Sequence, residues 1–172
     1  MAVEIRRLAQ DDLVRAFDCG DNALNTYLRR HAWINQEQNL IGVTYVSVEE
    51  DHPRIVVGYY TLATGDIARD SLPAEITEGL PRYQNLPVAL LARLAVDRRF
   101  QGSGLGKNLL RHTFESILKL PKHFGYRYVI VDAYSTAVGW YAKYGFTAIN
   151  GPSPNGMQPM FIDVRTLLKA TV

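Results

Sequence analysis

Three glycines at alternate positions, Gly102, Gly104 and Gly106, follow an apolar run and precede a helix-like segment in the stretch VDRRFQGSGLGKNLL. Glycine has no Cβ, so a ligand can lie directly against its backbone. Successive backbone N–H groups at the N-terminus of a helix often bind phosphate, because the positive end of the helix dipole adds to the N–H donors. Lys107 and Arg111 would add positive charge close by. The turn therefore predicts a site for a phosphate-bearing ligand.

Two familiar phosphate-binding motifs do not fit this turn. A P-loop requires G-x-x-x-x-G-K-[ST], but Gln101 stands in place of the first glycine and Asn108 follows Lys107. A dinucleotide fingerprint, G-x-G-x-x-G, would need glycine where Lys107 stands and an acidic residue near Arg127. What remains is the pattern Q-x-x-G-x-G, beginning at Gln101, between a strand and a helix.

The elements that position the turn follow from the apolar periodicity and from turn signals. The expected strands cover residues 4–9, 41–50, 54–67, 88–96, 127–133 and 158–164. The expected helical segments cover residues 11–17, 21–38, 105–118 and 136–146. Strands come first and a β-α-β-α-β order follows, which favours an α/β chain with a mixed sheet and helices packed on it.

The composition is that of a globular chain with a core. Of 172 residues, 47% are hydrophobic and 21% are charged, an ordinary balance for a single domain. Arg93 interrupts the most apolar stretch, so no run approaches the roughly 18 apolar residues of a membrane helix. The N-terminus has no apolar signal segment, Cys19 is the only cysteine, and the histidines lack ligand spacing. We therefore expect a cytoplasmic protein with no membrane segment, disulfide or metal site.

The segment around the turn resembles the acetyl-CoA signature of the GNAT superfamily of N-acetyltransferases, [QR]-x-x-G-x-[GA]. The preceding ARLAVD resembles the family's strand that pairs with the pantetheine arm, and AVGWYAKYGF resembles its A-x-x-x-Y-x-x-x-G-F element, with Tyr141 and Phe146 in register. Tyr134 departs from the asparagine that the family often carries there. The resemblance implies one domain over residues 1–172 with the GNAT fold. That fold is a central mixed, mostly antiparallel twisted sheet with flanking helices and a splayed central strand pair.

The same resemblance implies acetyl-CoA as co-substrate, held by the strand and the turn, and no metal. The residues expected to bind acetyl-CoA are Leu94, Ala95, Val96, Arg99, Gln101, Gly102, Ser103, Gly104, Leu105, Gly106 and Lys107.

Acetyl transfer to an amine needs a neutral amine, a donor to the oxyanion and a proton for the leaving thiolate. The backbone N–H of Val96 is our candidate oxyanion donor and Tyr141 our candidate acid, since a phenol of pKa about 10 can protonate a thiolate whose conjugate acid lies near 8.5. No residue stands out as a general base. An α-amine, with a pKa of about 7.7–8.0, needs less help to lose its proton than a lysine of pKa about 10.4, which favours an α-amine acceptor.

The N-terminal half, FDCGDNALNTYLRRHAWINQEQNLIGVTYV, resembles the opening of the acetyltransferase toxins of bacterial toxin–antitoxin pairs. The matching residues are Phe17, Cys19, Gly20, Leu24, Asn25, Tyr27 and Leu28. This resemblance implies acetylation of the amino acid on charged tRNA, which blocks translation. It also implies a ribbon-helix-helix antitoxin, binding of operator DNA only through the antitoxin complex, and a homodimer.

The distribution of charge agrees with a polyanionic partner. Between Arg93 and Arg127 stand eight Lys or Arg residues and two acidic residues, while the rest of the chain is net negative. Such asymmetry indicates an anionic partner, although a solvated helix face has the same composition. The residues expected to contact tRNA, mostly through its phosphates, are Arg29, Arg30, Arg93, Arg98, Lys119, Lys122 and Lys143.

Two other functions remain open at the level of sequence. The same fold and co-substrate would also serve an enzyme that acetylates a small amine or a protein N-terminus. A non-catalytic module that binds coenzyme A or another protein is the alternative from outside the enzymes.

Overall fold

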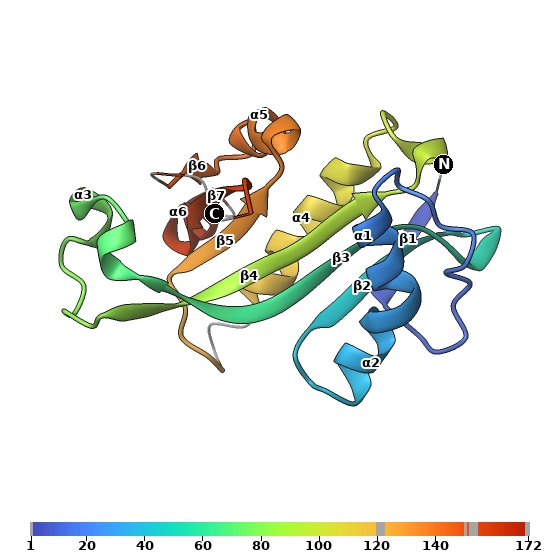
Figure 1. The fold of residues 1–172 in the computed structure, drawn as a ribbon, viewed down its shortest axis with the longest axis horizontal. Coiled ribbons are helices and arrows are strands. Elements are labelled where there is room, and N and C mark those ends of the chain that lie inside the picture. The colour runs from blue at the N-terminus through green and yellow to red at the C-terminus, as the bar shows by residue number, and fades with distance from the viewer. Residues whose placement is uncertain (1, 120–122, 150, 152–154, 171–172) are drawn as a thin grey trace. The chain divides into compact units, whose positions relative to one another are not determined.

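The computed structural model describes residues 2–119, 123–149, 151 and 155–170 (Figure 1). Its strands are β1 (Val3–Arg7), β2 (Val43–Glu49), β3 (His52–Ala68), β4 (Asn85–Val96), β5 (Tyr128–Ala133), β6 (Thr147–Ala148) and β7 (Gln158–Asp163). Its α-helices are α1 (Asn22–Thr26), α2 (Ala32–Glu37), α3 (Ala74–Thr77), α4 (Leu105–Leu118), α5 (Val138–Ala142) and α6 (Val164–Ala170). Single turns of other helix types are η1 (Tyr27–His31), η2 (Arg69–Ser71), η3 (Arg98–Phe100) and η4 (Ser135–Ala137).

The strands are hydrogen-bonded in the order β1-β2-β3-β4-β5-β7-β6. β4 and β5 run parallel, whereas β1–β2, β2–β3, β5–β7 and β6–β7 are antiparallel. The mixed, mostly antiparallel sheet expected from the sequence is thus confirmed. The parallel register joins residues 88–90 to residues 128–130, after which β4 continues to Val96 and β5 to Ala133.

The chain forms two compact units, and β3, β4 and α4 each contribute residues to both. Unit 1 comprises residues 1–63 and 91–116, and unit 2 comprises residues 64–90 and 117–172. Unit 1 contains the glycine turn, while unit 2 contains α5 and the last strands.

In unit 1 the helical segment predicted for residues 21–38 is confirmed but divided into α1, a π-helical turn η1 and α2 (Figure 1). Asp21 caps its start by accepting the N–H of Leu24 at 3.0 Å. The face of this segment packs on β2 and β3 in a core that includes Phe17, Leu28 and Tyr59. This core fixes the N-terminal segment in place beside the strands of its unit.

The helical turn predicted for residues 11–17 is wrong. Leu13 forms a parallel bridge with Ile55, and its N–H donates to Arg54 O at 2.7 Å. Sheet hydrogen bonds to a strand far along the chain therefore take the backbone groups that a local helix would have used.

Helix α4 lies close against β3 in unit 1 because Gly58 leaves room for it. A Cβ added at Gly58 would come within 3.0 Å of Leu109 and 3.3 Å of Leu105. Leu105 and Leu109 are almost fully buried. The apolar residues whose spacing predicted this helix therefore form its packing face. The close contact between Gly58 and Leu105 holds the first turn of α4 against β3.

Unit 2 has its own core beneath β5 and β7. Tyr128 is fully buried, packs edge-on against Phe161 with ring centroids 6.0 Å apart, and donates its hydroxyl hydrogen to Ile76 O at 3.0 Å. Val88 and Ile130 belong to the same buried cluster. After β5 the chain continues into η4 and α5. The short β6 and the helix α6 were not predicted from the sequence.

Candidate active site

The glycine turn joins the end of β4, through η3, to the start of α4. Gly102 and Gly104 have φ angles of 77° and 88°, in the left-handed region where only glycine is at ease. A Cβ built on either residue would meet no protein atom within 4 Å. The two glycines therefore allow an otherwise strained turn, and the space beside their backbone is open to a ligand.

The start of α4 supplies donors to that open space. The first hydrogen bond of the helix runs from Asn108 N–H to Gly104 O at 3.1 Å. The N–H groups of the preceding first turn, from Leu105 to Lys107, have no partner within the helix by the geometry of an α-helix. Since α4 is 14 residues long, its dipole places positive potential at the same end. This arrangement suits a diphosphate.

Asp97, the residue after β4, is almost wholly buried and organises the start of the turn. Its carboxylate accepts Nε and Nη2 of Arg99 at 2.8 and 3.1 Å, and it accepts the N–H of Asp18 at 3.1 Å. Burial by itself raises the pKa of Asp97, but the hydrogen bonds from Arg99 and Asp18 outweigh it and hold that pKa below its ordinary value. The guanidinium of Arg99, which was expected to bind acetyl-CoA, thus lies against Asp97.

Gln101, the first residue of the signature, ties the turn to two backbone segments. Its Nε2 donates to Val96 O at 2.9 Å and to Cys19 O at 3.0 Å. Both N–H groups of the side-chain amide are therefore used within the protein. Binding of acetyl-CoA by Gln101 remains a prediction, while these bonds give it a structural role.

The toxin-like motif at the N-terminus forms a loop that docks on the glycine turn. Arg98 N–H donates to Asp18 O at 2.9 Å, and the side chains of these residues pair at 3.4 Å. Asn25 closes the loop by donating to the Asp18 carboxylate at 2.8 Å and accepting Cys19 N–H at 2.9 Å. Gly20 has a φ of 92°, and an added Cβ would lie 3.1 Å from Nε of Arg98. The motif residues thus support the turn, a role that their spacing alone did not reveal.

Tyr141 lies on α5 in unit 2 and is 93% buried, with 7% of its surface exposed. Its ring packs edge-on against Trp140 and Phe146, at centroid distances of 5.0 and 5.5 Å. Burial raises the pKa of Tyr141 to about 12. The hydroxyl therefore stays protonated through the neutral range, as a proton donor must, although it is a weaker acid than an exposed phenol.

The residues expected to contact tRNA fall into two groups. Some are engaged within unit 1, because Arg93 stacks 3.5 Å above the ring centroid of Tyr27 and Arg29 donates to Phe17 O. Arg98 pairs with Asp18, as described above. Of the residues expected to contact tRNA, Arg30, Lys119 and Lys143 are exposed and form no ion pair with any described residue. Lys122 lies outside the described residues.

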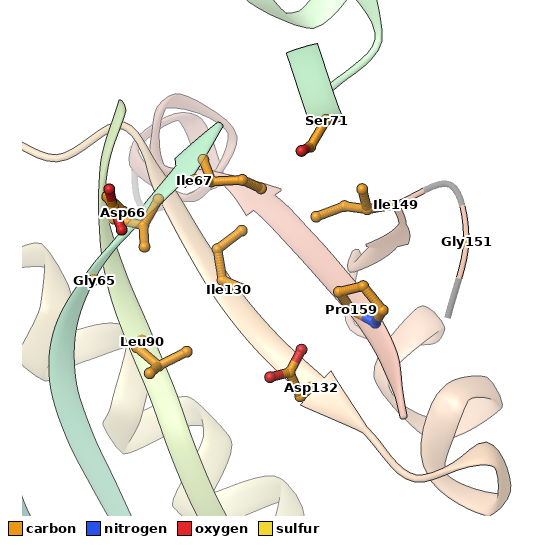
Figure 2. Close-up of a pocket in the computed structure, with 11 residues that line it drawn as sticks. Gly65, Asp66, Ile67, Ser71, Leu90, Ile130, Asp132, Ile149, Gly151 and Pro159 are labelled. Carbon is orange, nitrogen blue, oxygen red and sulfur yellow. The ribbon is translucent and has the colours of Figure 1, made fainter. Parts of the chain in front are cut away.

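A cavity of about 430 Å³ opens in unit 2, over the start of β4, the length of β5 and the region of β7 (Figure 2). Its walls are mostly apolar, and the carboxylates of Asp66 and Asp132 stand at separate places along it (Figure 2). Sequence analysis did not single out Asp132. The sequence signal that could have identified Asp132 is a charged residue near the end of the otherwise apolar strand YVIVDA.

Within the described residues, no group of three or more His, Cys, Asp or Glu side chains is arranged to hold a metal ion. No helix in that same part of the chain is both long enough and apolar enough to cross a membrane.

Comparisons with known proteins agree with this geometry. Residues 29–148 match the model of the acetyltransferase (GNAT) domain. The chain is similar to a tRNA-acetylating toxin of Mycobacterium tuberculosis (strain ATCC 25618 / H37Rv), with 33% identity over 164 residues and 95% of both chains covered. It is similar to the structure of AtaT complexed with acetyl-methionyl-tRNAfMet, with a TM-score of 0.87, 29% identity, and 99% of this chain and 100% of that chain covered. It is also similar to an AtaT mutant toxin bound to the C-terminus of the antitoxin AtaR and acetyl-CoA, with a TM-score of 0.80, 25% identity, and 99% and 98% covered.

Proposed function

We propose that this chain, which belongs to the GNAT acetyltransferase family, moves the acetyl group of acetyl-CoA onto the α-amine of the amino acid carried by a charged tRNA and thereby blocks translation. The observation that carries the proposal is the open backbone cradle at Gly102 and Gly104, followed by the N-terminus of α4. Similarity to a tRNA-acetylating toxin over 95% of the chain supports the choice of acceptor.

The residues present fit acetyl-CoA as co-substrate. A Cβ built at the left-handed Gly102 or Gly104 meets no protein atom within 4 Å, and backbone N–H groups at the start of α4 are the kind of donor that binds a diphosphate. Lys107 is exposed on the first turn of α4 and adds positive charge there. Acetyl-CoA supplies the activated acetyl group when bound. We assign to the Val96 N–H the support of the oxyanion, and to the Tyr141 hydroxyl the proton that the departing thiolate takes up.

We assign contact with tRNA phosphates to Arg30, Lys119 and Lys143, the members of the expected set that are exposed and have no ion-pair partner among the described residues. Arg29 and Arg93 already bind a carbonyl and an aromatic ring, so their first contribution is to the packing of unit 1. Phosphate contacts of this kind hold an acceptor stem without reading its sequence, and they weaken steeply as salt rises.

A relative bound to the C-terminus of its antitoxin supports a protein partner of the same kind. We propose a ribbon-helix-helix antitoxin that neutralises this enzyme, operator DNA bound only through the resulting complex, a homodimer, and action in the cytoplasm where charged tRNA is found.

The test is to incubate the protein with labelled acetyl-CoA and total charged tRNA, and to identify the acetylated aminoacyl species by mass spectrometry after nuclease digestion. Acetyl-aminoacyl-adenosine is the expected product. Acetylation of small amines or protein N-termini, with none of charged tRNA, would instead establish another acceptor. Binding of acetyl-CoA with no transfer to any amine would leave a non-catalytic module.

A further inference from the structure

The cavity of unit 2 has a size and a lining that suit part of a small organic ligand. At about 430 Å³ it lies in the lower part of the range of roughly 300–1,000 Å³ for small-molecule sites. The apolar part of its lining consists of Ile67, Val88, Leu90, Ile130, Ile149 and Pro159. Val88, Ile130 and Ile149 are buried and belong to the core of the unit, so this part of the cavity wall is rigidly packed.

The charge in the cavity disfavours phosphate and favours a cation. Two carboxylates, Asp66 and Asp132, are part of the lining, and the described residues that line the cavity include no Lys, Arg or His. Both aspartates are exposed, so solvent screens part of the repulsion, but two negative charges still disfavour the diphosphate of coenzyme A or a tRNA phosphate in this cavity. The two carboxylates would instead attract an ammonium group.

The two carboxylates differ in what they already bind. Asp66 accepts Nδ2 of Asn85 at 2.6 Å. Among the described residues no side chain forms an ion pair or hydrogen bond with Asp132, whose carboxylate projects toward the cavity from β5 (Figure 2). Asp132 is therefore the carboxylate that is available to a ligand.

The position of Asp132 along the chain connects the cavity with the proposed proton donor. It is the penultimate residue of β5, and Ala133 leads through η4 into α5, which carries Tyr141. β4, which contributes Leu90 to the wall, continues to Val96 at the base of the glycine turn. Of the four strands that contribute lining residues, β4 and β5 therefore continue along the chain into the segments assigned to acetyl transfer.

We propose that this cavity receives the aminoacyl end of the charged tRNA, with Asp132 binding the α-ammonium group and the apolar wall accepting an uncharged apolar side chain. The inference rests on the proposed function and adds the class of amino acid that is chosen. An acidic side chain is repelled by Asp66 and Asp132. A lysine side chain would place its ammonium group along the apolar wall, and the carboxylate of Asp66 already accepts Nδ2 of Asn85, so burial of this second ammonium group costs free energy.

The experiment uses one tRNA body charged separately with methionine, isoleucine, glycine, aspartate or lysine, so that the side chain is the only variable. We measure kcat and KM for the wild-type protein and for Asp132→Asn. The matched control is Asp51→Asn, which removes an exposed carboxylate in the turn between β2 and β3. A second variant, Ile67→Phe, narrows the half-buried wall, and Ile34→Phe on exposed α2 is its control.

The wild type should prefer methionine or isoleucine to aspartate and lysine by at least about tenfold in kcat/KM, the scale of discrimination by an apolar pocket. Asp132→Asn should lower kcat/KM about 10- to 100-fold, the worth of one hydrogen bond to a charged group. It should also move the acidic limb of the kcat profile to lower pH, because loss of the nearby negative charge lowers the pKa of the bound amine. Ile67→Phe should shift the preference toward glycine.

The outcomes separate the two proposals. A wild-type protein that binds acetyl-CoA but acetylates none of the charged tRNAs overturns the proposed function. If the wild type is active while Asp132→Asn matches Asp51→Asn in both kcat/KM and pH profile, the cavity is not the acceptor site and the proposed function stands. A preference for lysine or aspartate likewise overturns the assignment of an apolar side chain.

Discussion

Replacing Gly104 with alanine tests the cradle most directly. Gly104 has a φ of 88°, and its Cβ would project into space that holds no protein atom within 4 Å. The substitution should therefore lower the free energy of unfolding only by the cost of holding alanine in a left-handed conformation, about 1–2 kcal/mol. For a chain of this length that cost lowers Tm by about 2 to 8 °C. The new methyl group occupies the place assigned to the diphosphate, and loss of one charge-assisted hydrogen bond weakens acetyl-CoA binding about 10- to 100-fold.

The matched control for Gly104→Ala is Gly79→Ala. Gly79 has a φ of 79° and equally open surroundings, but it follows α3 in unit 2, away in sequence from the turn. Both variants should lose similar stability in thermal melts. Isothermal titration with acetyl-CoA should show a large loss of affinity for Gly104→Ala and none for Gly79→Ala.

A second variant separates crowding from backbone strain. Asparagine tolerates a left-handed backbone better than alanine, so Gly104→Asn should melt close to the wild type and still bind acetyl-CoA poorly. If Gly104→Ala and Gly104→Asn both bind acetyl-CoA as tightly as Gly79→Ala does, the coenzyme does not lie against this backbone and the reasoning is refuted.

Four other substitutions should behave as follows. Asp97→Asn should destabilise the protein by about 1–3 kcal/mol in denaturant titrations. Because the pKa of Asp97 is lowered on folding, its contribution is present at neutral pH and lost as pH falls below about 4, so the variant should show a shallower acid-side loss of stability. Tyr141→Phe should lower kcat about 10²- to 10⁴-fold with little change in Tm, and wild-type kcat should show no alkaline decline from this group until the pH comes within about one unit of its pKa of about 12. Arg30→Ala should reduce the salt slope of tRNA binding by about 1 with unchanged Tm, whereas Arg93→Ala should lower Tm; equal Tm losses in both would contradict our grouping.

Most of the strands and the long helix could be predicted because their apolar spacing is local. The helical spacing of apolar residues along α4 and the apolar stretches of β2 and β3 indicate buried segments whatever they pack against. The error at residues 11–17 has the opposite origin. Leu13 pairs with Ile55, and no pattern in the local stretch could indicate a bridge to a residue so distant in sequence.

The candidate site divides in the same way. Gly104 and Tyr141 were selected from motifs, and their functional roles stay predictions, while the structure gives Gly104 a left-handed backbone and buries Tyr141 on α5. The roles of Gln101, Asp97 and Arg99 could not, since their partners belong to the N-terminal loop or are fixed by burial. The motif identifies these residues by type and spacing, but it does not show which hydrogen bonds their side chains make.

By itself, the sequence determined the glycine turn before a helix, the order of strands and helices, and the resemblance to acetyltransferases, because each depends on residues close together in the chain. Only the tertiary structure decided which of the candidate cations remain exposed and unpaired among the described residues, and that Asp132 faces a cavity with Ile67, Leu90 and Ile149. The physical reason is that burial, pairing and charge are properties of neighbours in space, and folding brings those neighbours together from distant parts of the chain.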